Sequence, residues 1–118
     1  MRKGRKKKTR YISHVPKVLH FSPRGRQGRP DTTEISYDEY EAIRLVECQQ
    51  LNQTQAANEM GISRPSLGRI LRKARREIAS AIVMGKSLHI RMGEAQVGIR
   101  NISHHTSKAP NLKPQSAE

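Results

Sequence analysis

Cysteine and aromatic residues are scarce in this sequence of 118 residues, which has one Cys, no Trp, one Phe and three Tyr. The single Cys48 excludes a disulfide framework and a zinc site built from several thiolates. A hydrophobic content of 34% excludes a large buried core. No apolar run approaches the length of a membrane span, and no apolar segment follows the basic start as in a signal peptide. These absences predict a small cytoplasmic protein.

Acidic residues are also few. Ten Asp and Glu stand against 23 Lys and Arg, so the formal net charge is +13. A compact chain with this charge repels itself unless a polyanion neutralises it, which predicts nucleic acid as the partner. An anionic membrane surface is the other candidate, but the amphipathic helix expected from Ser63 to Gly85 lacks the Trp or Phe that anchor a helix in a membrane interface.

The charges fall into blocks along the chain. Residues 1–29 contain eleven Lys or Arg and no acid, residues 31–59 contain seven acids and one base, and residues 60–91 contain eight bases and one acid. A run of like charges at the start is typical of a segment that is disordered when free. The Pro- and Gly-rich stretch 22–30 is typical of a loop or linker.

The middle of the chain carries start and stop signals for three helices. Each expected helix follows a Ser or Asn that can cap it, and the first two have Glu or Gln three residues later, as in a capping box. The third has a Pro in its first turn, where the missing N–H does no harm, and a Gly at its end. The expected helices run from Ser36 to about Gln49, over about 53–60, and from Ser63 to Gly85.

The expected fold is therefore mainly α, with a three-helix unit over about 36–84 inside a folded domain that spans 31–91. A disordered basic arm and linker, residues 1–30, precedes this domain, and a loose tail, residues 92–118, follows it. Residues 87–91 alternate apolar and polar side chains, which is a weak signal for a strand.

The third helix has the clearest period in the chain. Its apolar side chains fall within an arc of about 120° at 100° per residue, which predicts one buried face. The opposite face is basic and centres on Arg69, Arg72 and Arg76. The apolar arc consists of Leu67, Ile70, Leu71, Ala74, Ile78, Ala81 and Ile82.

The tract from Thr54 to Leu71, TQAANEMGISRPSLGRIL, links the second expected helix to the third. Ala57 is small enough to let the two helices approach closely, and Gly61 suits a left-handed turn between them. This pattern predicts a helix-turn-helix, in which the first helix braces the second and the second enters the major groove of DNA. The agreeing positions are Ala56, Ala57, Met60, Gly61, Ile62 and Leu67.

The same tract resembles the DNA-binding fourth region of the main bacterial sigma-factor family. Over roughly residues 10–91 the chain more closely resembles a small prokaryotic family of predicted DNA-binding proteins, catalogued as an uncharacterised protein family (domain of unknown function one hundred and thirty-four). The matching stretches are Phe21-x-Pro23-x-Gly25 and the run from Tyr37 to Ile90. This resemblance implies a helix-turn-helix fold and a regulatory role, with no known enzymatic activity.

The expected DNA contacts lie on the third helix and on the arm. Ser66 and Arg69 are expected to read base edges, and Pro65 to touch a thymine methyl group. Phosphate contacts, which position the protein without reading sequence, are expected from Arg64, Arg72, Lys73, Arg76, Arg2, Lys3, Arg5, Lys6, Lys7, Lys8 and Arg10.

The expected function is sequence-specific binding of double-stranded DNA by a transcription regulator. A homodimer is expected because Ile78, Ala81, Ile82 and Val83 are more apolar surface than a small bundle can cover, and because the segment 88–90 adds an edge that could pair. The acidic first helix is expected to present a solvated face away from DNA, where a protein such as RNA polymerase could bind. The alternative is an RNA- or ribosome-associated basic protein, against which the scarcity of aromatics for base stacking counts.

No arrangement of residues points to catalysis, to a cofactor or to a metal. The five His lack ligand spacing with Cys or acidic clusters, and no Ser/His/Asp or Cys/His set is recognisable. Gly25 and Gly28 lie among Arg and Pro and not after an apolar strand, so they do not form a phosphate-binding loop. We expect no enzymatic activity.

Overall fold

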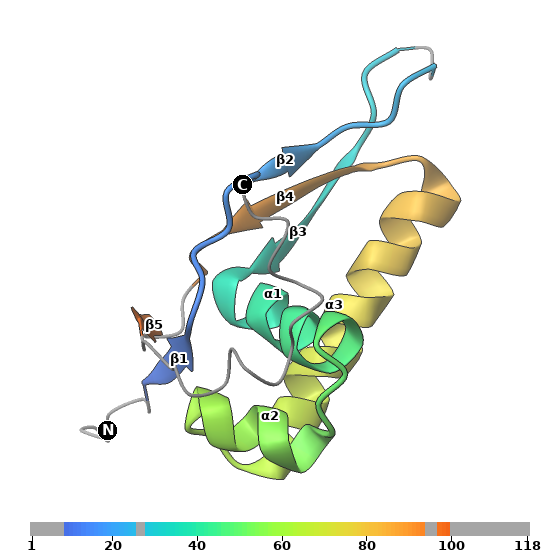
Figure 1. The fold of residues 1–118 in the computed structure, drawn as a ribbon. Helices are drawn as coiled ribbons and strands as arrows, with labels where there is room; N and C mark the ends of the chain where they lie inside the picture. The colour runs from blue at the N-terminus through green and yellow to red at the C-terminus, as the bar shows by residue number, and fades with distance from the viewer. Residues whose placement is uncertain (1–8, 26–27, 94–96, 100–118) are drawn as a thin grey trace, which may run out of the picture.

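The computed structural model describes residues 9–25, 28–93 and 97–99, in which three α-helices pack beside two small β-sheets (Figure 1). α1 (Tyr37–Ile43) continues directly into the π-helical η1 (Arg44–Cys48). α2 (Gln53–Met60) and the long α3 (Arg64–Met84) follow. The predicted positions of the second and third helices are confirmed. The first predicted helix changes to π-helical geometry over its last five residues.

The larger sheet has the strand order β2–β4–β3. β2 (His20–Phe21) runs antiparallel to β4 (Ser87–Arg91), and β4 runs parallel to β3 (Thr32–Ser36). The second sheet pairs β1 (Arg10–Ile12) in parallel with β5 (Val97–Ile99). The strand predicted over 87–91 is confirmed.

The prediction of a mainly α fold is wrong, because the described residues contain five strands beside the helices. Three of these strands, β1, β2 and β5, lie in segments that were expected to be a disordered arm and linker or a loose tail, and β1 and β5 pair with each other. The four strands that were not predicted are two to five residues long, too short to show a convincing alternation of apolar and polar side chains. Their partners lie far away in the sequence, so pairing and not local pattern stabilises them. Residues 1–8 and 100–118 of the expected arm and tail lie outside the described residues.

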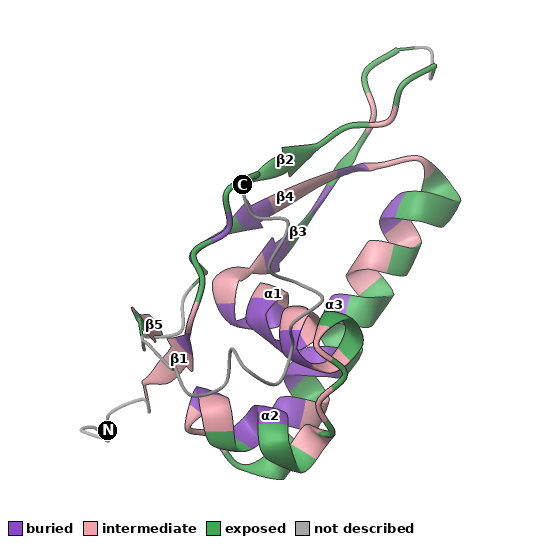
Figure 2. Ribbon diagram, in the orientation of Figure 1, coloured by how far each residue is buried: buried purple, intermediate pink, exposed green. Residues whose placement is uncertain are grey.

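One continuous core lies where α1, η1, α2 and α3 meet (Figure 2). The two Ala residues of α2 are at most 2% exposed, so this helix packs closely against α3. The buried members of this core are Ala42, Leu45, Ala56, Ala57, Met60, Leu67, Ile70 and Leu71. Ile12, Ile35 and Ile90, from three different strands, are also at most 3% exposed.

The C-terminal turn of α3 departs from the predicted apolar arc. Ile82, which the arc placed in the core, is 77% exposed, and its neighbour Val83 is 80% exposed. The expectation that residues 88–90 form an unpaired edge is also wrong, because β4 is the central strand of its sheet. The sheet thus uses both edges of β4 for pairing, and of the residues on which the expected dimer rested, Ile82 and Val83 remain exposed.

Candidate nucleic-acid interface

A tight turn of three residues, Gly61–Ser63, joins α2 to α3. Gly61 ends α2 in the left-handed conformation, with φ 71° and ψ 30°, as its sequence position predicted. Its neighbour Ile62 donates its backbone N–H to the Ala57 carbonyl oxygen (3.0 Å) and packs against the core. The turn therefore fixes the direction in which α3 leaves α2.

Both helices of this pair have well-formed N-terminal caps. Asn52 Oδ1 accepts the backbone N–H of Gln55 (2.8 Å), and Gln55 Oε1 accepts that of Asn52 (2.9 Å). At the start of α3, Ser63 Oγ accepts the N–H of Ser66 (3.2 Å). These caps satisfy backbone donors that the helix itself cannot, so both helix starts are well defined.

The exposed first turns of α3 carry a small side-chain network. Ser63 Oγ lies 3.0 Å from Ser66 Oγ, to which Arg69 Nη2 also donates at 3.0 Å. Ser66 is half-buried, whereas Arg64, Pro65 and Arg69 are exposed. Ser66 therefore orients the guanidinium of Arg69 at the surface, where Arg offers a planar pair of donors.

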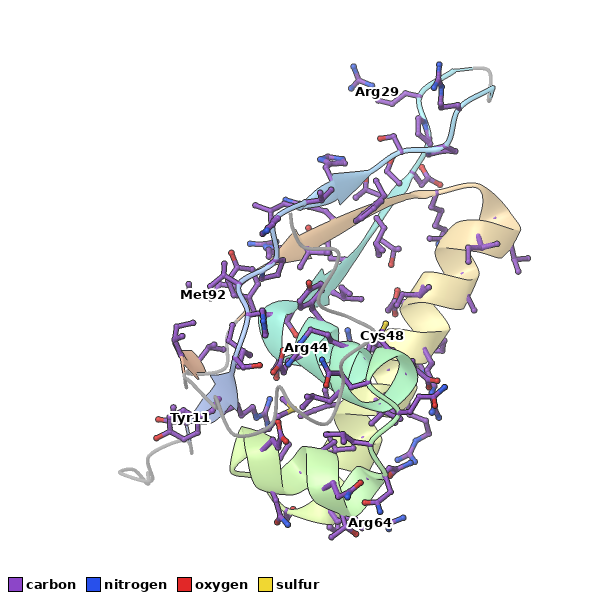
Figure 3. All side chains as sticks on the ribbon, viewed as in Figure 1. Tyr11, Arg29, Arg44, Cys48, Arg64 and Met92 are labelled. Carbon is purple, nitrogen blue, oxygen red and sulfur yellow. The ribbon has the colours of Figure 1, made fainter. Side chains whose placement is uncertain are left out.

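The basic face of α3 has the composition that the sequence predicted. Arg69, Arg72 and Arg76 follow one another at helical spacing and are all exposed. The ion pairs of the described residues leave these three and Arg64 without a carboxylate partner. Figure 3 shows Arg64 at the end of the molecule formed by α2 and the start of α3.

The other charged side chains of α3 contact partners on other elements of the protein. Lys73 Nζ lies 3.2 Å from Glu39 Oε2, and Arg75 Nε donates to Glu47 Oε2 (2.7 Å). Glu77 accepts a hydrogen bond from Thr33 of β3. Of the residues expected to bind phosphate, Lys73 is thus engaged by a carboxylate.

The expectation that α1 presents a solvated acidic face is wrong. Asp38, Glu39 and Glu41 are 3%, 7% and 2% exposed. Arg44 Nε and Nη2 donate to Glu41 (2.9 and 3.0 Å). The backbone N–H and Oγ of Ser13 donate to the same carboxylate (3.0 and 2.9 Å). Burial of a carboxylate is tolerated only with such partners, so Glu41 holds the segment that follows β1 onto α1.

Arg10 has a role that its place in a basic run did not reveal. It lies in β1, and its Nη1 is 2.5 Å from Oδ2 of Asp38, which is 4% exposed at the side chain. The remaining predicted arm contacts lie outside the described residues: Arg2, Lys3, Arg5, Lys6, Lys7 and Lys8. Arg10 thus connects the start of the described chain to α1.

Two hollows lie beside these ion pairs. The larger, of about 530 Å³, has three bases among its lining residues, Arg10, Lys73 and Arg91, and each of them is paired with a carboxylate. The smaller, of about 330 Å³, is lined by His14 and Tyr40 among others. Burial, and next the nearby Arg44, lowers the pKa of His14, and burial raises the pKa of Tyr40.

Neither a membrane segment nor a metal site emerges from the described ranges. None of their helices is long and apolar enough to cross a bilayer. Within the same ranges, no three His, Cys, Asp or Glu side chains are grouped so that they could share a metal ion.

Comparison with known proteins matches residues 1–98 to the family described as "Protein of unknown function DUF134". A UPF0251 protein of Prosthecochloris aestuarii is 41% identical over 93 residues, covering 78% of this chain and 60% of that protein. A UPF0251 protein of Dehalococcoides mccartyi is 39% identical over 94 residues, covering 79% of this chain and 80% of its own. One of Pyrococcus furiosus is 40% identical over 90 residues, covering 75% and 83%. No solved structure matches the chain.

Proposed function

We propose that this chain, which belongs to the DUF134 family, binds double-stranded DNA in a sequence-specific manner through α3. In this proposal α2 and α3 act as a helix-turn-helix resembling the fourth region of bacterial sigma factors. α2 braces the motif, and the first turns of α3 enter the major groove. The three-residue turn with a left-handed Gly61 is typical of this motif.

One observation carries the proposal. The exposed face of α3 bears Arg69, Arg72 and Arg76 without carboxylate partners among the described residues, whereas the acids nearby are buried or paired elsewhere. Unpaired cations gathered on one face repel one another, and a bound polyanion relieves this repulsion. A stripe of bases on one helix next to a tight turn is typical of DNA-binding proteins.

The residues of α3 divide by the chemistry that each can supply. Arg69 suits the two acceptors on a guanine edge, and Ser66, which orients it, can bond any base. Pro65 is exposed and apolar, as a contact with a thymine methyl group requires. Arg64, Arg72 and Arg76 are suited to phosphates. Lys73 and Arg10 would first have to leave Glu39 and Asp38.

We further propose that the protein acts in the cytoplasm as a homodimeric transcription regulator. The exposed Ile82 and Val83 at the end of α3 supply an apolar surface for a second copy. A two-fold dimer would double the DNA contacts and require a palindromic site. A contact with RNA polymerase stays a prediction, and the buried carboxylates of α1 no longer support it.

The decisive experiment is a selection of bound fragments from the host genome, followed by competition between the recovered duplex, random duplex and structured RNA at one fixed salt concentration. We expect the recovered duplex to compete best and to contain an inverted repeat. Preferential competition by structured RNA would instead favour the alternative of an RNA- or ribosome-associated protein, which the basic residues 1–8 would also suit.

A further inference from the structure

The described residues of the loop between β2 and β3, 22–25 and 28–31, extend away from the body of the molecule (Figure 1). Gly25 and Gly28 have φ of 79° and 77°, which glycine adopts without strain. A Cβ atom at either position would meet no other atom within 4 Å. The described part of the loop is therefore slender and surrounded by solvent.

The loop carries cations that the fold does not use. Arg24 and Arg29 are exposed, and neither has an ion pair or a side-chain hydrogen bond with any described residue. The nearest acid in sequence, Asp31, holds the base of the loop, where its carbonyl oxygen accepts the Ser87 N–H (2.7 Å). Two guanidinium groups without a structural partner, in a slender loop, point to a function outside the fold.

We propose that Arg24 and Arg29 enter the minor groove of duplex DNA beside the α3 site and favour A·T-rich flanking sequence. This inference rests on the proposed DNA binding by α3. The minor groove is about 6 Å wide, so it admits an extended chain with glycines better than a helix. Its A·T tracts are narrower and more negative, and they attract inserted arginines.

The position of the loop makes such a contact possible. Its base is hydrogen-bonded to Ser87, two residues beyond Gly85, which ends α3. The 21 residues of α3 span ~30 Å at 1.5 Å per residue. One turn of B-DNA is about 34 Å, so the length of α3 is close to one turn of the duplex. Figure 3 shows Arg29 and Arg64 at opposite ends of the molecule, so Arg29 lies far enough from the start of α3 to contact a groove other than the one that α3 enters.

The test uses the full chain and duplexes that carry one selected site between flanks of A·T, G·C or inosine·cytosine pairs. Inosine·cytosine pairs lack the guanine amino group, so they present the minor groove of A·T pairs and the major groove of G·C pairs. The variants are Arg24→Ala/Arg29→Ala, the charge-conserving Arg24→Lys/Arg29→Lys, and Lys17→Ala as an exposed control outside the loop.

We expect the wild-type chain to bind A·T and inosine·cytosine flanks about equally, and about tenfold more tightly than G·C flanks. The double Ala variant should lose this preference without a change in melting temperature, because neither Arg supports the fold. The double Lys variant should keep most affinity for G·C flanks but lose much of the preference, because the more strongly hydrated ammonium enters a narrow groove less readily. The control should retain the preference.

Three outcomes would overturn the inference while leaving DNA binding by α3 intact. They are the absence of a flank preference, a preference that survives in the double Ala variant, and a preference for A·T over inosine·cytosine flanks, which indicates reading in the major groove. The inference would also be overturned if the double Ala variant lost affinity for structured RNA and kept its affinity for duplex DNA, because the loop would then bind RNA. A wild-type chain that binds no duplex would contradict the proposed function itself.

Discussion

Gly61 connects the local sequence to the geometry of the candidate interface. Its positive φ of 71° is unfavourable for any residue that has a Cβ atom, because the side chain then clashes with its own backbone. The conformation is least favourable for a β-branched residue. Every side chain of α3 leaves the core in a direction that this one turn sets. Backbone strain at a single residue therefore affects both stability and the presentation of Arg69.

Replacing Gly61 with Val should lower the free energy of unfolding by about 1–2 kcal/mol through backbone strain. Chemical denaturation followed by circular dichroism measures this. Gly68→Ala is the matched control, since Gly68 lies inside α3 and an added Cβ would stay 3.6 Å from Gln53 Oε1. The control should gain about 0.5–1 kcal/mol from helix propensity. An unchanged stability of Gly61→Val would contradict the left-handed conformation of this turn.

Arg69→Ala should weaken binding to the selected site by about 1–3 kcal/mol and weaken binding to random duplex much less, because the lost contact is to a base edge. Fluorescence anisotropy at one fixed salt concentration measures both affinities. Arg75→Ala is the control, as Arg75 is a base of the same helix that pairs with Glu47. Equal losses on both duplexes would make Arg69 a phosphate contact.

At the scale of elements, α1 and α3 are joined by charge as well as by apolar packing. Lys73 on α3 meets the buried Glu39 of α1, whose Oε1 also accepts the Ser36 backbone N–H (2.8 Å). The Lys73 side chain is 50% exposed, so solvent screens this pair and reduces its value. The pair still gives Lys73 a structural partner that the free cations of α3 lack.

Lys73→Met should therefore reduce the free energy of unfolding by about 0.5–1 kcal/mol and change DNA affinity less than Arg72→Ala does. Met keeps the apolar length of the side chain and removes only its charge. Thermal denaturation and DNA titration of the two variants, side by side, give the comparison. A larger affinity loss in Lys73→Met would mean that Lys73 leaves Glu39 when DNA binds.

The basic residues before β1 should increase affinity for DNA without adding sequence preference. Deleting residues 1–8 removes six Lys and Arg and leaves Arg10 paired with Asp38. If four to six of these charges neutralise phosphates, the slope of log affinity against log salt should shrink by roughly 3.5–5.5 units on specific and random duplexes alike. A loss confined to A·T-rich flanks would instead indicate minor-groove reading by the arm. An unchanged slope would exclude DNA as its partner.

At the scale of the whole molecule, the exposed end of α3 is the surface to test for self-association. Ile82 and Val83 are 77% and 80% exposed, although residues of this type are usually buried. We expect analytical ultracentrifugation to show a dimer at tens of micromolar, and Val83→Glu to shift it towards the monomer with an unchanged melting temperature. A monomer for the wild-type chain, both alone and on DNA, would contradict the dimer.

The sequence by itself determined the parts of the protein that depend on neighbouring residues. Caps, a left-handed Gly and an apolar period act within one or two turns of helix, so the limits of α2 and α3 and the turn at Gly61 followed from local chemistry. The same period indicated which bases of α3 face solvent. The run of Arg and Gly in residues 22–30 was visible as a loop, but the lack of a structural partner for the guanidinium groups of Arg24 and Arg29 was not.

Only the tertiary structure decided which segments pair across the chain. β1 meets β5, and β3 meets β4, across long stretches of helix, and strands of two to five residues have too little pattern of their own to reveal such partners. In the sequence, the buried carboxylates of α1 cannot be distinguished from those of a solvated acidic face. They are buried because Arg10, Ser13 and Lys73 come from distant segments to compensate them. Charge pairing between residues that are far apart in the sequence, like strand pairing, depends on the folded arrangement.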